Sequence, residues 1–516
     1  TTHSLLVMLI ATILVVVVLS LVVIREAWRR RSPRWRMLMK FPGDFPWPFV
    51  GNALQLGFHV DEAPAKIMAL WEKHGKSNFR MLVGSEDWVF LCEPDDIGAI
   101  LSHQTELSKT PERNAAMIPF FGHSVSTSEG EKWRCIRKLM APSFNFNTLE
   151  SRVATTNKHC KYLMDILENH GSDPIALYRY IRPFMFDVIT STLMGTDYDY
   201  LSDRNHPYFT ASGKINEIAS TNYFSYWRNI ESLFRLTSSY REMMDTIQVV
   251  YHMSDKIIRD RKFILESKEK DIVNNNKNIK VNLDEVVHES LSANAFLLDS
   301  LILGKFPNGL PIPDHMIREE VTLLCFTGQY TTAMTICNVL YCLAKYPEIQ
   351  KRVFEEQQSI FRGDTLRDPN TQDLNEMKYL EAVIKETMRA IPTVPKLGRS
   401  LKEDLTLRDG RVIPAGATVI VFYEGLFLND KVFPEPEKYN PERFFENMHT
   451  FAFVPFSAGP RNCIGFRFAW VAMKATLSNI LRRFEVSEVP GAEPRFAYRI
   501  ITESTNDIQL KLTKRV

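Results

Sequence analysis

The hydrophobic and polar positions along the chain follow a helical period over most of its length. From about residue 56 onward, apolar residues recur at intervals of three and four, as they do on one face of an α-helix. Residues 403–423 change to short β-branched runs around an Asp-Gly turn, which predicts a small hairpin. The polar run over residues 267–282 predicts a solvated loop or a disordered insert. We therefore expect a mainly α fold with a minor β-sheet region toward the C-terminus.

The first long apolar run, residues 5–24, carries no charge and has about the length that crosses a bilayer as one helix. Residues 25–40 follow with seven Lys or Arg and one Glu, and such positive flanks stay on the cytoplasmic side. The alternative, a cleaved signal peptide, has a shorter apolar region and a small-residue cleavage site, which is not visible after Ile24. We predict a transmembrane anchor over residues 5–24, a basic and Pro/Gly-rich linker over residues 25–55, and one cytosol-facing domain over residues 56–516.

A second uncharged run, residues 321–344, is also long enough to span a membrane. It contains five threonines together with Gln329 and Asn338, and its basic flank is weaker than that of the first run. A long helix through the core of a large domain fits this composition better.

Composition excludes several classes of protein. With 63 basic and 61 acidic side chains, the formal charge is +2, so nothing in the charge balance calls for nucleic acid as a partner. The seven cysteines are scattered, and no CxxC pair occurs, which argues against a zinc site or a disulfide framework. A reducing environment that faces the cytosol fits this cysteine usage.

One loop near the C-terminus carries the strongest chemical signal. The sequence FSAGPRNCIG, residues 456–465, holds a single cysteine, Cys463, with no second cysteine or histidine beside it to complete a zinc site. A helical pattern follows, so Cys463 is predicted at a helix start, where free N–H groups and the nearby Arg461 favour a thiolate. One soft anionic ligand suits an iron whose other ligands come from a macrocycle, that is, a haem. The alternative is a buried structural cysteine.

The spacing of this loop matches a family signature. Five residues fit the pattern FxxGxRxCxG of haem-thiolate monooxygenases, namely Phe456, Gly459, Arg461, Cys463 and Gly465. The chain therefore resembles the cytochrome P450 family. The resemblance implies the cytochrome P450 fold for the domain over residues 56–516, a bound haem b (iron protoporphyrin IX) with Cys463 as the iron ligand, and Phe456, Arg461 and Gly465 as cofactor-binding residues.

Three charged residues match a second pair of family motifs. Glu386 and Arg389 stand three apart on a predicted helix and therefore share a face. By itself such a pair is compatible with a surface salt bridge of little energetic value. The resemblance implies instead that both meet Arg443, from the segment NPERFF, in a buried structural knot.

Three further residues match positions that bind the haem propionates in this family. Trp133 and Arg137 reproduce its WxxxR pair, and Arg399 falls where another propionate-binding arginine is usual. The alternative for the WxxxR pair is a core tryptophan beside a solvated arginine.

The segment over residues 319–333 matches the central helix that crosses the distal haem face in the family. Gly328, Thr331 and Thr332 fit its pattern, but Tyr330 stands where an acid is usual. The resemblance implies catalytic roles for Thr331, Thr332 and Tyr330, with Thr331 able to hydrogen-bond iron-bound dioxygen. Because a phenol is a poor proton source at neutral pH, we expect slow turnover with proton delivery that depends on Thr331 and water.

The surrounding motifs resemble the fatty-acid ω-hydroxylase clan, particularly its insect branches (family 4-like). In that clan a glutamate often forms a covalent ester with the haem, and Thr327 occupies its position here. We therefore expect haem that is not esterified to the protein. Two segments are candidates for contact with substrate: residues 117–125 as pocket lining, and the aromatic residues 221–234 as a membrane contact or channel cap, with core packing as the alternative for both.

The resemblance implies an enzyme that inserts one oxygen atom from O2 into a lipophilic substrate such as a fatty acid, hydrocarbon, hormone or xenobiotic. No flavin or nicotinamide fingerprint is visible, so electrons would come from NADPH through NADPH-cytochrome P450 reductase, with cytochrome b5 as a further donor. A basic docking face for the acidic reductase is predicted, or else a merely solvated surface, at Lys132, Arg134, Lys138 and Arg467. The expected location is the endoplasmic reticulum membrane, with a single span.

Two other functions remain open from the sequence. One is a haem-thiolate isomerase or dehydratase that acts on hydroperoxides without a reductase, which the substitution at Tyr330 would permit. The other is a non-catalytic haem-binding protein, which would leave the distal threonines unexplained.

Overall fold

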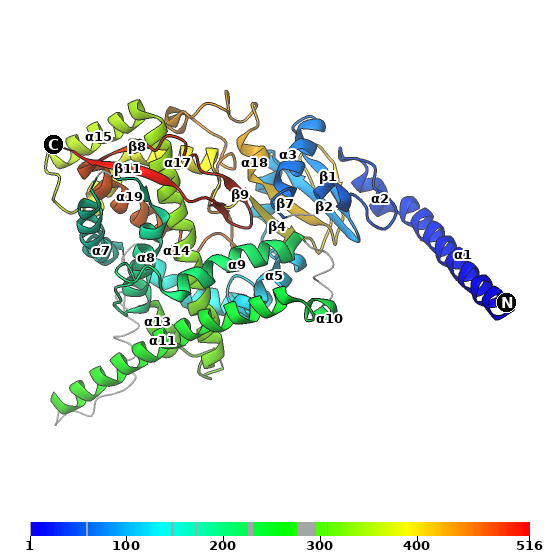
Figure 1. Cartoon of the computed structure of the whole chain (residues 1–516), viewed down its shortest axis with the longest axis horizontal. Helices are drawn as coiled ribbons and strands as arrows, with labels where there is room; N and C mark the ends of the chain where they lie inside the picture. Colours follow the sequence, from blue (N-terminus) through cyan, green and yellow to red (C-terminus); the bar gives the residue numbers. More distant parts are fainter. Residues whose placement is uncertain are drawn as a thin grey trace. The chain divides into compact units, whose positions relative to one another are not determined.

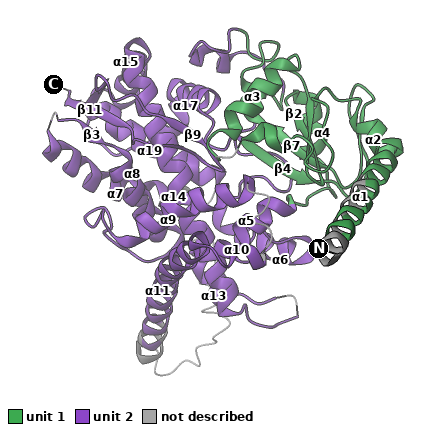
Figure 2. Ribbon diagram, turned by 45° about the vertical axis from the view of Figure 1, so that its right-hand side comes forward, with its two compact units in different colours: residues 1–110, 396–434, 450–452 green, residues 111–395, 435–449, 453–516 purple. Residues whose placement is uncertain are grey.

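The computed structural model describes residues 2–57, 60–145, 149–171, 173–224, 231–275, 296–306 and 308–515. Within these ranges the chain forms two compact units (Figure 2). Unit 1 comprises residues 1–110, 396–434 and 450–452, and unit 2 comprises residues 111–395, 435–449 and 453–516. Part of the predicted loop over 267–282 (276–282) and part of the aromatic segment over 221–234 (225–230) lie outside the described residues.

Unit 1 is built on a four-stranded sheet with the strand order β1-β2-β7-β4. Its strands are β1 (Phe79–Val83), β2 (Glu86–Leu91), β7 (Thr418–Phe422) and β4 (Lys396–Ser400). β1 and β2 form an antiparallel hairpin, β7 runs parallel to β2, and β4 runs antiparallel to β7. All five residues of β1 and of β7 are buried, so these strands are enclosed on both faces and lack the alternating pattern of a half-exposed strand.

The helices of unit 1 pack around this sheet, and its aromatic side chains fill the core. The helices are α1 (Thr2–Arg31), α2 (Pro33–Leu38), η1 (Ala53–Leu56), α3 (Ala63–Lys73), α4 (Pro94–Leu101) and α18 (Tyr423–Phe427). The Phe79 and Phe90 rings stack with 4.5 Å between centroids, and Trp71 of α3 meets Phe422 edge-on at 6.3 Å. The predicted hairpin within residues 403–423 is confirmed: β5 (Leu405–Thr406) pairs antiparallel with β6 (Val412–Ile413).

The helix α1 contains the apolar run over residues 5–24. In the part of the chain that the structure describes, no helix is both long enough and apolar enough to cross a membrane. The side chains of several residues of this run lie outside the described part. The anchor therefore stays a prediction.

Unit 2 is mostly helical. Its longer helices are α5 (Pro111–Phe121), α6 (Gly130–Met140), α7 (Leu149–His170), α8 (Tyr178–Ile189), α9 (Pro207–Phe224), α11 (Ser238–Asn275), α14 (Asp314–Lys345), α15 (Pro347–Phe361), α17 (Lys378–Ala390) and α19 (Phe466–Arg483). Short helices are η2 (Ala141–Phe144), η4 (Thr190–Met194), α10 (Glu231–Phe234), α13 (Leu297–Ile302), α16 (Thr371–Glu376) and η6 (Pro441–Phe445). Two small sheets complete the unit: β3 (Ile175–Ala176), β11 (Gln509–Lys514) and β8 (Phe484–Glu488) in the order β3-β11-β8, and the hairpin of β9 (Phe496–Tyr498) and β10 (Thr502–Ser504).

The helix α14 forms the axis of unit 2 (Figure 1). It packs against α8, α11, α19 and β8, and residues on all of its faces are buried. This environment confirms that the uncharged run over residues 321–344 is a core helix, since apolar residues around the whole circumference are what a fully enclosed helix requires.

The expected fold class, mainly α with a minor β-sheet part, is confirmed for the described residues. Two expectations about placement were wrong. The sheet region is not confined to the C-terminal part, because β1 and β2 lie before residue 92. The polar run that begins at residue 267 is not a loop from its start, because α11 continues to Asn275. Lys and Glu side chains are good helix formers on an exposed surface, so a polar composition alone did not end this helix.

Candidate functional site

Cys463 lies at the end of a tightly folded loop that precedes α19. The Cys463 N–H donates to the Phe456 carbonyl over 2.9 Å, and the Asn462 N–H donates to the Gly459 carbonyl over 3.1 Å. Ser457 (φ 61°) and Gly459 (φ 68°) both adopt left-handed backbone conformations, which turn the chain sharply. α19 begins at Phe466, three residues after Cys463 rather than at the cysteine itself. The loop therefore closes on its own backbone and presents the cysteine at one end.

The Cys463 side chain differs in exposure from those of the other cysteines. Cys463 is exposed, whereas Cys92, Cys160, Cys325, Cys337 and Cys342 are buried and Cys135 is half-buried. Burial also raises the pKa of the Cys92 and Cys160 thiols to about 12, which makes them poor ligands. Within the described ranges, no group of three or more His, Cys, Asp or Glu could hold a metal ion.

The helix α6 braces the Cys463 loop through two side chains. The Arg137 guanidinium donates to the Asn462 carbonyl over 2.9 Å and to the Asn462 Oδ1 over 2.6 Å. The guanidinium carbon of Arg461 lies 4.1 Å from the ring centroid of Trp133. Burial lowers the pKa of Arg137, and the negative charge of a Cys463 thiolate opposes this shift. The guanidinium groups of Arg137 and Arg461 therefore lie at the Cys463 loop, where they can balance the negative charge of a thiolate.

The buried Arg461 also holds the loop over residues 124–128. Its guanidinium donates to the Ser128 carbonyl over 2.8 Å and to the Val125 carbonyl over 3.4 Å. On the other side of this loop, the Val125 N–H donates to the carboxyl of Glu320 in α14 over 2.8 Å. Residues 124–128 therefore connect the Cys463 loop to the central helix.

The residues around Cys463 fit a haem-thiolate group. An accessible sulfur stands on a loop that closes on its own backbone, and a stacked Trp–Arg pair and a second arginine adjoin that loop. Phe456 packs against Phe466 and Trp470 of α19 at 6.3 and 6.1 Å between ring centroids, which adds an aromatic surface beside the loop. A large flat macrocycle with two carboxylates requires this combination of one thiolate, aromatic surface and cationic groups. Arg399 belongs to unit 1, in β4, and its propionate-binding role stays a prediction.

The structure brings Glu386, Arg389 and Arg443 together in a buried cluster. Arg389 donates to the two Glu386 carboxylate oxygens over 2.7 and 2.9 Å, and Arg443 Nε lies 3.2 Å from Glu386 Oε2. The Asn440 N–H donates to Glu386 as well, over 2.7 Å, and both arginines donate to the Lys438 carbonyl. Glu386 has no exposed surface. This arrangement has the satisfied hydrogen bonds that a buried ion cluster needs, and it ties α17 to η6.

Within α14, the three predicted catalytic residues have different surroundings. Thr331 is half-buried, and its hydroxyl donates to the Thr327 carbonyl over 2.9 Å. Thr332 is buried at the next position. Tyr330 is also buried, and its hydroxyl donates to the carboxylate of Glu503 in β10. Burial holds the pKa of Tyr330 well above its ordinary value, so this phenol stays neutral at physiological pH.

The sequence reading missed four residues of this environment. Two of them contact Tyr330, namely Arg182 and Glu503. Of the other two, Asn462 accepts hydrogen bonds from Arg137, and Glu320 accepts one from Val125 in the predicted lining segment. Asn462 lies inside the cysteine motif, at a position that the motif leaves open. Glu503 is 173 residues from Tyr330, and no local pattern marks it.

An accessible cysteine on a short loop before a helix, in a mainly helical unit with a buried central helix, is an arrangement that can hold a haem-thiolate group. A sequence profile for the family described as Cytochrome P450 matches residues 41–512. The chain belongs to the cytochrome P450 family, and it is a haem-dependent monooxygenase. Among its relatives in Drosophila melanogaster is "Cytochrome P450 4d2", which is 32% identical over 496 residues that cover 95% of each chain.

Two further relatives from Drosophila melanogaster agree. "Cytochrome P450 4c3" is 31% identical over 94% of this chain and 91% of its own length. "Probable cytochrome P450 4e1" is 32% identical over 88% of this chain and 83% of its own length. The predicted resemblance to the insect branch of family 4 is therefore confirmed.

Proposed function

We propose that this chain is a membrane-anchored monooxygenase of the endoplasmic reticulum that hydroxylates lipophilic substrates with electrons from NADPH. The observation that carries the proposal is the accessible Cys463 thiol, held on a loop that Arg137 and Trp133 brace from α6. A thiolate ligand donates electron density that favours cleavage of the O–O bond, which is the chemistry of oxygen insertion.

The division of labour between the haem and this chain follows from the site. When bound, haem b supplies the iron at which O2 is activated, so that one oxygen atom enters a substrate C–H bond and the other leaves as water. The chain contributes ligation by Cys463 and delivery of two protons. The Thr331 hydroxyl gives its own hydrogen to the Thr327 carbonyl, so its oxygen can accept a hydrogen bond from water on its open side.

The haem is held without an ester link in this proposal. The clan's ester is formed by a glutamate, and Thr327 stands at that position. The Thr327 hydroxyl donates to the Leu323 carbonyl over 2.8 Å, as a helical threonine commonly does. A hydroxyl has no carboxyl group to esterify.

The N-terminal helix supports membrane attachment. Apolar side chains in the first three-quarters of α1 are exposed, among them Met8, Leu9, Ile13, Leu14 and Leu21. Arg29, Arg30 and Arg31 follow in its last turn, where the cytoplasmic end of an anchor carries positive charge. A bilayer would cover the apolar surface, and a lipophilic substrate would reach the enzyme from the same phase.

Two features of unit 2 support the remaining parts of the proposal. The predicted lining segment 117–125 packs on α14, with 5.2 Å between the ring centroids of Phe121 and Phe326 and both rings buried, so a substrate beside this part of α14 would lie near apolar side chains. Arg134, Lys138 and Arg467 are exposed on α6 and α19, the two helices beside the Cys463 loop. They support docking of an acidic electron donor, NADPH-cytochrome P450 reductase or cytochrome b5, on this side.

A spectrum and a turnover assay test the proposal. The purified holoprotein, reduced and exposed to carbon monoxide, should show the red-shifted Soret band of thiolate ligation. Cys463→Ala should abolish this band, whereas Cys135→Ala, at a half-buried cysteine of α6, should retain it. Product formation from dodecanoic acid should require both NADPH and reductase. Conversion of an added hydroperoxide without NADPH or reductase would favour the alternative hypothesis of a haem-thiolate isomerase or dehydratase.

A further inference from the structure

Tyr330 occupies the position where the central helix of this family usually carries an acid, and its hydroxyl donates to a carboxylate from elsewhere in the chain. That carboxylate is Glu503 Oε2, in β10. The Tyr330 ring also meets Tyr178 of α8 edge-on at 5.9 Å and has the Arg182 guanidinium carbon 4.8 Å from its centroid. A carboxylate therefore reaches α14 from the C-terminal hairpin rather than from the helix itself.

Hydrogen bonds from two segments, α9 and residues 392–393, hold the hairpin that carries Glu503. In α9, Asn216 binds both the N–H and the carbonyl of Ile501, over 3.1 and 2.9 Å. The Ile500 N–H donates to the Ser220 hydroxyl over 3.0 Å. Thr502 donates its N–H to the Thr393 carbonyl and its hydroxyl to the Pro392 carbonyl. The fold thus fixes the backbone of the three residues before Glu503.

Glu503 also reaches solvent, unlike Tyr330. Its side chain is 15% exposed, and its second oxygen accepts a hydrogen bond from Arg499 over 2.7 Å. A proton relay needs a group that exchanges protons with solvent, followed by a group that leads inward. Glu503 and the buried Tyr330 phenol stand in this order, since the carboxyl group can take a new proton from water.

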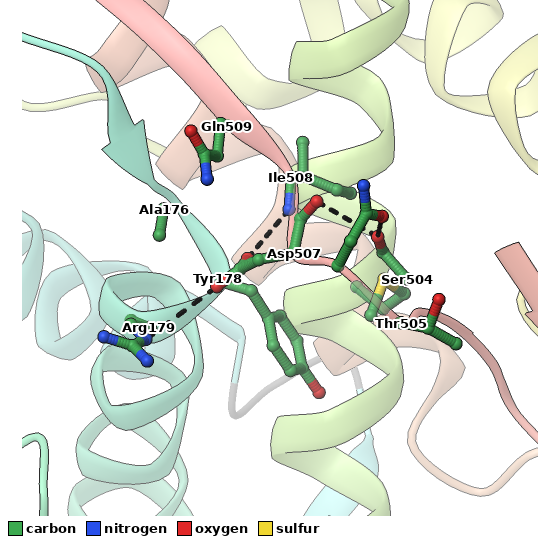
Figure 3. Close-up of a pocket in the computed structure, with 10 residues that line it drawn as sticks. Ala176, Tyr178, Arg179, Ser504, Thr505, Asp507, Ile508 and Gln509 are labelled. Atoms are coloured by element: carbon green, nitrogen blue, oxygen red, sulfur yellow. Dashed lines mark hydrogen bonds and ion pairs between the residues drawn. The ribbon is translucent and has the colours of Figure 1, made fainter. Parts of the chain in front are cut away.

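A pocket of about 530 Å³ adjoins the same cluster (Figure 3). Ser504, Thr505, Asn506 and Gln509 line it from the C-terminal segment, and Met334 of α14 lines its inner side. Tyr178 also lines the pocket, and Figure 3 shows its ring beside α14. Water that enters this polar pocket would lie next to the Tyr178 ring, which contacts Tyr330.

We propose that Glu503 replaces the acid that position 330 lacks, and that it supplies protons to α14 through the Tyr330 hydroxyl. This inference rests on the proposed monooxygenase function. In the relay, protonated Glu503 donates to the Tyr330 oxygen, and the phenolic hydrogen turns away from Glu503 toward a water molecule on the side of Thr331. As the Glu503 proton moves to the Tyr330 oxygen, the phenolic proton moves to that water, which carries it onward. The phenol stays neutral, and water returns a proton to the Glu503 carboxylate. Glu503 acts through Tyr330 and is therefore a positioning and proton-supplying residue, not one that touches the substrate.

A purely structural role would need the same hydrogen bond but no transferable proton. Glu503→Gln separates the two roles, because the amide oxygen still accepts from Tyr330 while the amide cannot supply a proton. Tyr330→Phe keeps the ring and removes the relay atom. Glu493→Gln, at an exposed glutamate before β9, and Tyr341→Phe, on the same helix as Tyr330, are the matched controls.

The test measures hydrogen peroxide released per NADPH oxidised by the holoenzyme with reductase and dodecanoic acid. Glu503→Gln and Tyr330→Phe should each raise this ratio at least threefold, and both controls should leave it unchanged. Adding Tyr330→Glu to Glu503→Gln should restore the ratio toward the wild-type value. It returns a carboxyl group to α14, where Arg182 already provides a cationic neighbour.

A second measurement does not depend on turnover. The unfolding midpoints of Tyr330→Phe, Glu503→Ala and their combination should be non-additive, with the double variant close to the worse single one. Additive midpoints would show that the contact is absent and would overturn the inference. An unchanged peroxide ratio in Glu503→Gln would overturn the inference alone, since haem binding and NADPH-dependent product would persist. A wild-type protein with a normal carbon monoxide spectrum but no NADPH-dependent product would overturn the proposed function, and the inference with it.

Discussion

The Arg461 guanidinium lies over the Trp133 ring, with 4.1 Å between the guanidinium carbon and the ring centroid. Both side chains are buried, so this cation–π contact is shielded from water. It joins α6 to the loop of Cys463, the predicted iron ligand, at a point two residues before that cysteine.

Removal of the Trp133 ring should loosen that loop. A desolvated cation–π contact contributes about 2 kcal/mol, so Trp133→Leu should lower the free energy of unfolding by at least that amount and reduce the haem retained after gel filtration. Trp133→Phe should lose less, because a smaller ring remains. Lys132→Ala, on the same helix, serves as the control. Full haem retention in Trp133→Leu would show that the contact does not support the loop.

Glu386 should be structural rather than chemical. Removal of one partner from a buried ion cluster typically costs about 3–5 kcal/mol, because the remaining charges lose their compensation. Glu386→Ala should therefore give misfolded or haem-free protein, while Lys385→Ala, at the preceding position of α17, should give normal protein. Haem absorbance per unit of protein is the measurement. Normal haem content with lost turnover would point to a role in chemistry.

The carboxyl of Glu320 should make stability depend on pH. Burial raises its pKa to about 8, and the hydrogen bond from Val125 opposes that shift only in part. The ordinary value is 4.5, so between about pH 4.5 and pH 8 the folded protein holds a proton that the unfolded chain has released. Stability should accordingly fall as the pH rises through this window, by up to about 4 kcal/mol.

Urea unfolding of the holoprotein between pH 5 and pH 8 measures this dependence. Glu320→Gln should flatten the profile, since an amide does not titrate. Glu348→Gln, at an exposed glutamate in the first turn of α15, should keep the wild-type slope. The same slope in Glu320→Gln as in wild type would assign the effect to another group.

Thr331 should control how efficiently NADPH is used. Thr331→Ala removes the hydroxyl beside the predicted oxygen site, so more NADPH should be diverted to peroxide and water, with a loss of product of about tenfold or more. Thr331→Ser retains a hydroxyl and should keep most of the coupling. Peroxide and product per NADPH are the measured quantities, and equal coupling in all three proteins would show that protons bypass this residue.

Deletion of residues 5–24 should release much of the protein from membranes. An apolar helix of this length is what holds a single-span protein in the bilayer, whereas the remaining surface gives weaker attachment. Fractionation of membranes before and after an alkaline wash measures the release. A glycosylation tag placed within residues 56–516 should stay unmodified in microsomes, and efficient glycosylation would reverse the proposed topology.

Local patterns in the sequence predicted the parts of the fold and site that depend on neighbouring residues. The Asp409-Gly410 turn produced the β5–β6 hairpin because Gly410 adopts a φ of 82° that few other residues tolerate. The uncharged run over 321–344 became the core of α14 because a fully enclosed helix has no polar face. The spacing around Cys463 likewise describes one loop, and that loop folds on its own backbone.

Contacts between distant segments could not be predicted in the same way. Glu503 meets Tyr330 only because the β9–β10 hairpin is held against α9 and α14. A single sequence does not reveal contacts between segments so far apart in the chain. The strand β1 escaped notice for a different reason: its residues are buried on both faces, so no alternation marks it as a strand.

Two side chains of α9 bind the backbone just before Glu503. Ser220 binds Ile500, three residues before it, and Asn216 binds Ile501, two residues before it. Because these bonds go to main-chain groups, they fix the position of the hairpin independently of the side chains that it carries. In a duplicated gene, exchange of one polar residue of α9 could therefore move the tip of the β9–β10 hairpin. Every motif residue of the Cys463 loop and of α14 would stay the same. Descendants of one ancestral enzyme would then differ in proton supply and substrate fit although their signatures were identical.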